Sequence, residues 1–163
     1  HGAGLQAHRH NRHRPMKALS VRQPWAHMIM MDGIGRKDVE NRTWTTSHRG
    51  LLAIHASKTC TAEEWYEAEQ FCRRRGLPLP PSRSHLVRGA ILGVVTLTDI
   101  LQPTESPEEL QGWRVAGQHG WHLTDPQRLD EPIEASGSLG LWEVPPYSVA
   151  ETMINRLNLQ ADA

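Results

Sequence analysis

Hydrophobic and polar positions follow two different periods along this chain, one typical of strands and one typical of helices. Residues 18–21 and 51–56 form short apolar runs that predict buried strands. The strongest strand pattern covers residues 89–100, which are rich in β-branched side chains and include Gly93 as a predicted bend or bulge. Further strands are expected at 37–44, at 121–123, around Ile133 and at 139–144.

Capping residues mark the clearest helix. Thr61 is a good N-cap, Glu64 follows three residues later as in a capping box, and Gly76 comes directly after the end of a helix over 62–75. Other helices are expected over 25–29 after Pro24, from Ser106 onward and within 146–159, and residues 77–84 are expected to form a loop. Strands outnumber helices and do not alternate with them, which favours an α+β fold with one small, curved or closed sheet.

The length and composition exclude several classes of protein. At 163 residues the chain is expected to form one domain, over residues 16–163. No apolar run reaches the ~18 residues that a membrane span needs, and no charged stretch leads into an apolar one as in a secretory signal. Cys60 and Cys72 are the only cysteines, which excludes a disulfide scaffold and suits a reducing compartment. We therefore expect a cytoplasmic protein without membrane contact.

The neutral total charge conceals an uneven distribution. Residues 1–15 hold three of the 18 basic residues, four of the ten histidines and no acid, so residues 16–163 carry a net charge of −3. The first 15 residues have too few apolar side chains to offset their ordering entropy, and we expect a disordered tail or a remnant of cloning before Met16. The acidic remainder argues against a protein that grips long nucleic-acid duplexes by charge alone.

The most polar of the predicted strands carries the densest cluster of reactive side chains. Alternation along it places Glu40, Arg42 and Trp44 on one face and Asn41 on the opposite face. Lys37 precedes them and is expected in the turn at the start of the strand. A strand this polar is either a solvated edge or the wall of a cleft.

Two further segments favour the cleft. Arg22, Gln23 and Trp25 lie where a strand turns into a helix, a place where exposed basic and aromatic residues are less expected. His55 and Ser57 end an apolar strand and share one face of it. Arginine and tryptophan together suit a flat ligand that is anionic or has a π face, through bidentate hydrogen bonds and stacking.

Common cofactor and metal motifs are missing from the chain. It contains no G-x-G-x-x-G, no Walker A motif, no H-E-x-x-H and no C-x-x-C. We therefore expect no nucleotide cofactor and no metal site.

Five sequence blocks stand out in a fixed order. They are S-V-R-Q-P-W-A at 20–26, G-R-K-D-V-E-N-R-T-W at 35–44, R-G-L-L-A-I-H-A-S at 49–57, G-A-I-L-G-V-V-T-L-T-D at 89–99 and G-S-L-G-L-W at 137–142. Together they resemble the ASCH domain, a member of the PUA-like superfamily that is related to the EVE and YTH modules. The resemblance implies a small β-barrel of about five to seven strands flanked by helices, with a positively lined cleft beside Lys37.

The resemblance also implies binding of RNA, of a nucleobase or of a modified nucleoside. Some relatives are ribonucleases, and a group of small bacterial members hydrolyses N4-acetylcytidine with a Lys and, three residues on, a Thr nucleophile, helped by a later Glu. Here Lys37 keeps its place, Glu40 stands at the Thr position, and Asp99 is a tentative counterpart of the later acid. A carboxylate can activate water but cannot replace a hydroxyl nucleophile, so this departure leaves catalysis an open question.

Most candidate residues also have a structural interpretation, which for Lys37 is an exposed ion pair with Glu40 or Asp38. Glu40 is either a general base or the partner that orients Lys37. The other structural roles are an ion pair with Glu40 or Asp38 for Arg22 and Arg42, a core position for Trp25, Trp44 and His55, and a turn for Asp99.

We predict a module, assumed monomeric, that binds RNA, a nucleobase or a nucleoside in a cleft formed by residues 22–25, 37–44 and 55–57. One alternative is a hydrolase of N4-acylated cytidine or of RNA that uses Lys37 with Glu40 or Asp99 as the activating acid. A second alternative is a protein-docking domain of the kind found in transcription coactivators.

Overall fold

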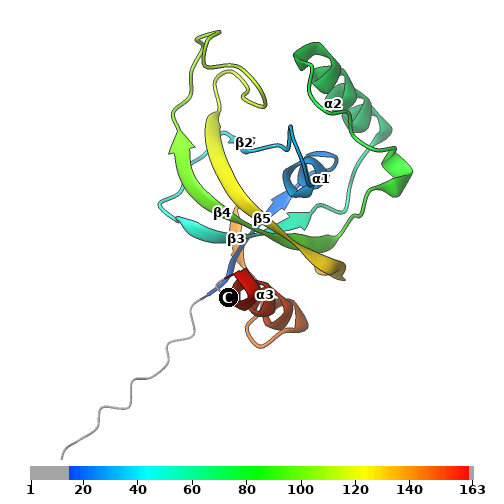
Figure 1. The fold of residues 1–163 in the computed structure, drawn as a ribbon, viewed down its shortest axis with the longest axis vertical. Helices are drawn as coiled ribbons and strands as arrows, with labels where there is room; N and C mark the ends of the chain where they lie inside the picture. Colours follow the sequence, from blue (N-terminus) through cyan, green and yellow to red (C-terminus); the bar gives the residue numbers. More distant parts are fainter. Residues whose placement is uncertain (1–14, 162–163) are drawn as a thin grey trace, which may run out of the picture.

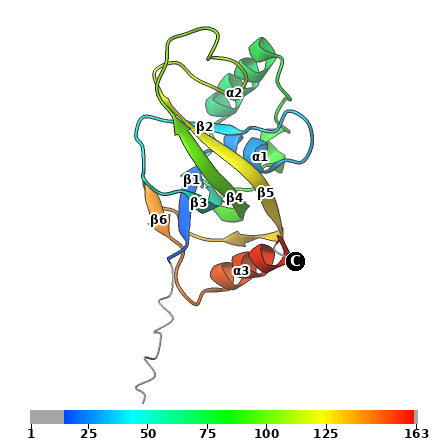
Figure 2. The same cartoon turned by 60° about the vertical axis from the view of Figure 1, so that its left-hand side comes forward.

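A computed structural model describes residues 15–161 as a curled sheet of six strands with three helices (Figures 1 and 2). The strands are β1 (Lys17–Val21), β2 (Val39–Arg42), β3 (Gly50–Ala56), β4 (Ala90–Leu101), β5 (His119–Glu134) and β6 (Leu141–Glu143), in the spatial order β2-β5-β4-β3-β1-β6. The helices are α1 (Trp25–Met30), α2 (Ala62–Arg75) and α3 (Val149–Ala161), and a short 3-10 turn covers Arg83–His85. The predicted α+β class with a small, barrel-like sheet is confirmed.

The sheet is antiparallel except for β1 and β3, which run parallel. β4 and β5 form its longest ladder, and register shifts within that ladder make the two strands bend across the molecule. Gly93 lies at one of these shifts, where an added Cβ would meet the carbonyl oxygen of Gln127 and lie 2.9 Å from the Cα of Arg128. Only glycine fits so close to the neighbouring backbone, which explains the bend predicted there.

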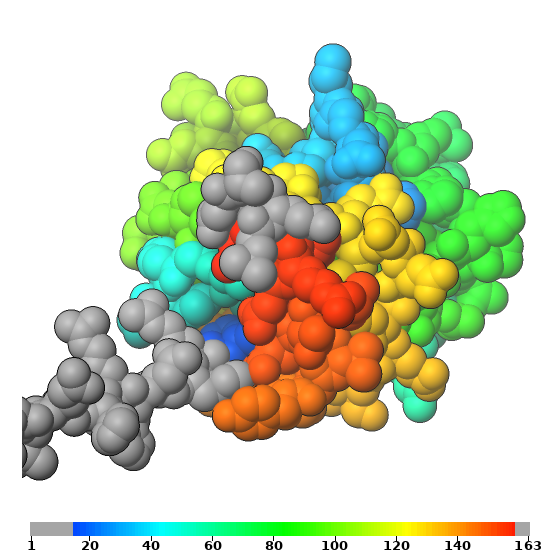
Figure 3. All heavy atoms as spheres, turned by 60° about the horizontal axis from the view of Figure 1, so that its bottom comes forward, coloured from blue at the N-terminus to red at the C-terminus, as the bar shows by residue number. Residues whose placement is uncertain are grey.

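Apolar clusters cover both faces of the sheet. One cluster packs α1 against the sheet around Leu19, Ile54 and Trp121, all fully buried. The other packs α3 against the opposite face around Ile91 and Ile154. Figure 3 looks onto the α3 side, where this helix and the segment leading into it form the central part of the visible surface.

The capping residues of α2 act as predicted. The Thr61 hydroxyl accepts a hydrogen bond from the backbone N–H of Glu64 at 3.1 Å, and Gly76 ends the helix in the left-handed conformation. Although α2 has fourteen residues, only Ala68 and Cys72 among them are buried. The helix therefore stands beside the sheet and leaves one face toward the space between them.

The residues 121–123 and Ile133 lie in a strand as predicted, but the division into short strands is wrong, because β5 runs unbroken over that whole stretch. Pro126 and Pro132 and many polar residues mask its strand pattern in the sequence. The prolines are tolerated because β2 pairs only with the first part of β5, from His119 to His122, and leaves the rest as a sheet edge.

The helix predicted from Ser106 onward is also wrong. Only one turn forms there, in which the N–H groups of Glu109 and Leu110 both donate to the carbonyl of Ser106. The segment has too few apolar side chains to anchor a helix, and Gly112 adopts a positive φ of 60° shortly afterwards. The predicted tail over residues 1–15 lies, except for Pro15, outside the described residues.

Candidate functional site

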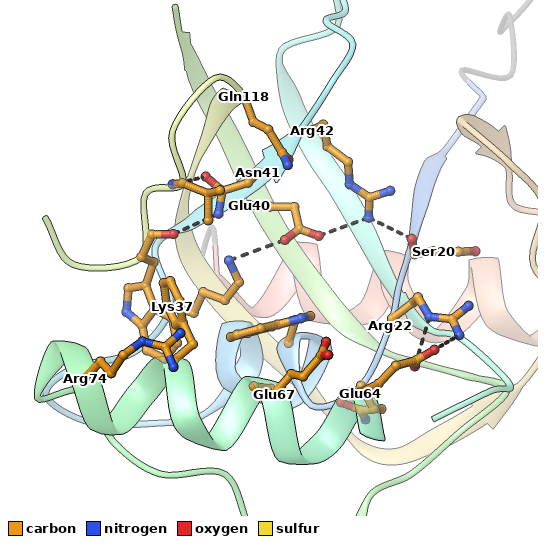
Figure 4. A pocket seen from close by; sticks show the side chains of 16 residues that line it. Ser20, Arg22, Lys37, Glu40, Asn41, Arg42, Glu64, Glu67, Arg74 and Gln118 are labelled. Atoms are coloured by element: carbon orange, nitrogen blue, oxygen red, sulfur yellow. Dashed lines mark hydrogen bonds and ion pairs between the residues drawn. The ribbon is translucent and has the colours of Figure 1, made fainter. Parts of the chain in front are cut away.

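A cavity of about 530 Å³ opens between α2 and the strands β1 and β2 (Figure 4). Its volume falls within the range of roughly 300–1,000 Å³ that small-molecule sites occupy. Five segments of the chain build its walls, which are the end of β1, the start of α1, β2 with the turn before it, one face of α2 and the loop 113–118. The lining residues are Ser20, Arg22, Gln23, Trp25, Lys37, Glu40, Asn41, Arg42, Glu64, Glu67, Ala68, Phe71, Arg74, Trp113, Val115 and Gln118.

Lys37 lies at the base of this cavity and is only 2% exposed. Its ammonium donates to the carbonyl of Val39 and lies 3.3 Å from a carboxylate oxygen of Glu40. The same nitrogen lies over the rings of Trp25 and Trp113, at 5.4 and 5.7 Å from their centroids. A carboxylate and two aromatic faces thus replace the water that a buried ammonium loses.

Glu40 joins Lys37 to Arg42 in one row of charges. Its first carboxylate oxygen faces Lys37, and its second accepts from Nη2 of Arg42 at 3.0 Å. The same Arg42 nitrogen donates to the backbone carbonyl of Ser20 at 2.9 Å, which ties β2 to β1 across the cavity. Figure 4 shows the three side chains pointing toward one another. The row carries one net positive charge because two cations share one carboxylate.

Burial and charge act in opposite directions on Lys37. Desolvation lowers the pKa of its ammonium below the usual value of 10.5, while the carboxylate of Glu40 raises that pKa and so opposes part of the effect. The cation Arg42 adds to the lowering. A lysine whose pKa is lowered by burial beside a carboxylate is typical of functional sites, although buried structural ion pairs share this property.

Three aromatic side chains form the apolar part of the wall. Trp25 meets Phe71 edge-on at 5.6 Å between ring centroids and Trp113 edge-on at 6.2 Å. Phe71 and Trp113 lie 6.5 Å apart with their planes tilted by 30°. These rings come from α1, α2 and the loop 113–118, so the wall exists only when the three segments are folded together.

Asn41 and Gln23 hold the walls in place and have both side-chain groups occupied. The Asn41 amide donates to the carbonyl of Trp113 at 2.8 Å, and its oxygen accepts from the N–H of Val115 at 2.9 Å. The Gln23 amide donates to the carbonyl of Val87, while its oxygen accepts from the N–H of His27 in α1. Both side chains therefore hold the walls of the cavity together and have no free polar group.

Arg22 lies at the mouth of the cavity and is half exposed. Its guanidinium forms a two-point ion pair with Glu64 of α2, one of whose contacts is a 3.1 Å bond from Nε. This hydrogen-bonded pairing raises the pKa of Arg22 and lowers that of Glu64. The alternative that gave Arg22 an ion pair is thus correct, but the partner is on α2 and not Glu40 or Asp38.

Comparison with known proteins agrees with the fold and the five sequence blocks. The family model of the ASCH domain matches residues 19–133, well over half of the chain. The chain belongs to the ASCH domain family. ASCH domains are generally RNA-binding modules. The matched range includes every wall of the cavity and ends before β6 and α3.

Two curated relatives are similar to this ASCH chain. Activating signal cointegrator 1 of Homo sapiens is 35% identical over 95 residues, and the protein of the same name of Mus musculus is 34% identical over 95 residues. Each alignment covers 56% of this chain and 15% of the relative. The similarity therefore concerns a small part of those longer proteins. In the described part of this chain, no helix has both the length and the apolar character to cross a membrane.

Four residues predicted for the ASCH site lie outside the cavity. The ring of Trp44 packs edge-on against Trp121 at 4.8 Å between centroids, next to the core. His55 is buried between the Ser20 hydroxyl and the carbonyl of Ala135, at 3.0 and 2.7 Å. Ser57 and Asp99 do not line the cavity either, and the Asp99 carboxylate accepts from the N–H of Ile100 at 2.8 Å.

Nine of the sixteen residues that line the cavity are not among those predicted from the sequence. Glu64, Phe71 and Arg74 share one face of α2, and their spacing of seven and then three residues is the helical signal that could have identified them. Trp113 stands in a loop without periodicity, and nothing in the local sequence indicates that it reaches Lys37. The cleft also contains four cations and three carboxylates, so it is less positive than the family resemblance implies.

Proposed function

We propose that this ASCH domain binds a nucleobase, either in a nucleoside or in a single strand of RNA, in the cavity between α2, β1 and β2. The observation that carries the proposal is the row formed by the buried Lys37 and Glu40 and the partly buried Arg42 at the base of an aromatic-walled cavity. A base is flat, has an apolar face and presents donors and acceptors along its edge. The cavity offers aromatic side chains for the face of a base and charged side chains for its edge.

Arg42 supports this proposal through its remaining donors. Its Nε is buried and has no hydrogen-bond partner among the described residues, while Nη2 is already used twice. Nη1 forms no hydrogen bond with the described residues and is not enclosed as Nε is, so a ligand in the cavity can offer an acceptor to it. A carbonyl or ring nitrogen on the edge of a base is such an acceptor.

The aromatic rings support the same class of ligand. Stacking of a base on an aromatic side chain contributes about 1–3 kcal/mol in proteins that bind single strands. Trp25 and Phe71 line the cavity and are only partly buried, so part of each ring is accessible. The rings thus supply the apolar contact, and the charged residues of the same cavity supply partners for the polar edge of a base.

Hydrolysis of an acylated cytidine or of RNA is the second candidate. The lowered pKa of Lys37 favours it, because a buried lysine beside a carboxylate can donate a proton or stabilise developing charge. The carboxylate of Glu40 is shared between Lys37 and Arg42, which supports its role as an orienting partner. The hydroxyl of Ser20 bonds to His55 and Trp142, and in Figure 4 its side chain points away from the cavity.

A protein-docking role is the third candidate. It draws on the printed name of the relatives, activating signal cointegrator 1, which describes those longer proteins. A docking role would need no ligand in the cavity, so a binding experiment separates it from the first proposal.

Isothermal titration calorimetry with adenosine, cytidine, guanosine and uridine tests the proposal. We expect saturable binding of at least one nucleoside and a roughly tenfold loss of affinity in Arg42→Lys, because lysine keeps the charge but lacks the planar guanidinium with its Nη1 donor. Arg49→Lys is the matched control, since Arg49 is exposed and does not line the cavity. Affinity for every nucleoside that is equal in both variants would refute the proposed contact.

The same samples separate the three candidates. Incubation with N4-acetylcytidine, followed by chromatography, detects cytidine if the domain is a hydrolase, and that product must vanish in Lys37→Met. If a nucleoside binds and no cytidine is formed, the nucleobase-binding module is the remaining candidate. If a folded, cooperatively melting protein neither binds a nucleoside nor forms cytidine, protein docking is the remaining candidate.

A further inference from the structure

The four cations that line the cavity differ in how they are neutralised. Lys37 and Arg42 share Glu40, and Arg22 is paired with Glu64. Arg74 of α2 has no ion pair or hydrogen bond with any described residue, and it is exposed. An anion that enters the cavity can therefore bind the guanidinium of Arg74 without breaking an existing ion pair.

Arg74 also differs from the two arginines beside it. Arg73 bonds to Glu69 on its own helix at 3.3 Å and does not line the cavity. Arg75 donates to the carbonyl of Gly112 at 3.0 Å and stacks on the ring of Phe71 at 4.9 Å. Three consecutive residues of one type thus have three different surroundings, and only Arg74 combines a free guanidinium with a position on the cavity wall.

The face of α2 that lines the cavity changes sign along its length. Glu64 and Glu67 stand toward its start and Arg74 stands near its end. Glu64 and Arg74 are ten residues apart, which corresponds to about 15 Å along a helix axis. Figure 4 shows Arg22 and Arg74 toward opposite ends of the cavity, with Glu67 between them. Two carboxylates disfavour an anion at the Arg22 end, whereas the Arg74 end attracts one.

We propose that the ligand carries a phosphate and that Arg74, not Arg22, binds it. This inference rests on the proposed function, because the base of the nucleotide occupies the cavity while its phosphate lies against Arg74. Arginine suits the role because its planar guanidinium donates two parallel hydrogen bonds to phosphate oxygens. The phosphate belongs either to a free nucleotide or to the backbone of a strand, and both present the same oxygens.

Calorimetry with the four ribonucleosides, their 5′- and 3′-monophosphates and a hexameric RNA tests the inference. The quantity measured is the ratio of nucleotide affinity to nucleoside affinity. In the unmodified chain we expect at least one monophosphate to bind about tenfold more tightly than its nucleoside. In Arg74→Ala that advantage is expected to disappear, and in Arg73→Ala it is expected to persist, because Arg73 lies next to Arg74 but outside the cavity.

The outcomes distinguish the inference from the function on which it rests. Nucleosides that bind as tightly as their monophosphates, or equal losses in Arg74→Ala and Arg73→Ala, would overturn the role of Arg74 alone. The absence of binding by any nucleoside, nucleotide or hexamer would overturn both proposals. A hexamer that binds more tightly than every monophosphate, with the same loss in Arg74→Ala, assigns the phosphate to a strand. Tighter binding by a monophosphate assigns it to a free nucleotide. Thermal melting confirms folding, since Arg74 is exposed and its truncation removes no buried contact.

Discussion

Lys37 shows how a single charged residue can be accommodated inside this fold. Its side chain is fully enclosed, yet its nitrogen keeps a backbone carbonyl, a carboxylate and two indole faces as partners. Replacing one member of such a buried pair costs about 3–5 kcal/mol, because the remaining charge then has no partner. Arg42 moderates that cost for Glu40, since it contacts the same carboxylate from the other side.

The lowered pKa of Lys37 predicts a pH dependence of stability. The native state releases this proton at a lower pH than the unfolded chain does, so the unfolded chain binds more protons as the pH approaches 10.5. Lys37 therefore adds stability as the pH rises toward that value. Urea unfolding at pH 7, 8, 9 and 10 should show a difference between the free energies of unfolding of the unmodified chain and of Lys37→Met that grows with pH.

Lys58 provides the control for that experiment, because it is exposed. Lys58→Met should give a curve parallel to that of the unmodified chain. Parallel curves for Lys37→Met as well would mean that the lysine has the same pKa in both states.

At the scale of the element, α2 is the best-predicted segment, although only two of its fourteen residues are buried. Its boundaries follow from local signals, a hydroxyl cap at one end and a glycine at the other, which act within a few residues. Such signals do not depend on the rest of the fold. β5 is the opposite case, since its continuity depends on pairing with β4 and is invisible in its own sequence.

Because α2 buries few residues, its cap should matter more than usual. Thr61→Ala removes the acceptor of the Glu64 N–H and should lower the free energy of unfolding by about 1 kcal/mol. Thr59→Ala, two residues earlier at an exposed position, should change it by less than about 0.5 kcal/mol. Chemical denaturation measures both changes, and equal values would show that the hydroxyl of Thr61 does not cap the helix.

At the scale of the whole molecule, the cavity depends on how the sheet curls. The β4–β5 ladder brings the loop 113–118 back toward Lys37, and β5 positions β2 by pairing with Val39–Arg42. Gly93 is one point at which this ladder bends. The site is therefore a product of long-range pairing, and a distant change in the ladder should affect it.

Gly93→Ala tests whether the ladder depends on glycine at this bend. The added methyl group would press on the backbone of β5 at Gln127 and Arg128, so we expect a loss of about 1–3 kcal/mol in the free energy of unfolding. Hydrogen exchange should show the loss of protection concentrated along β4 and β5. An unchanged free energy would mean that the ladder can shift to make room.

The amino-acid sequence alone determined the α+β class, the bounds of α2, the bend at Gly93 and the clustering of charged side chains around Lys37, Glu40 and Arg42. These features depend on periodicity and on short-range hydrogen bonds, which are properties of neighbouring residues. The tertiary structure decided which side chains meet in the cavity, because the rings that contact Lys37, those of Trp25 and Trp113, come from two other segments of the chain. It also placed His55 and Asp99 elsewhere, since the two faces of a strand are distinguished only by what packs against them.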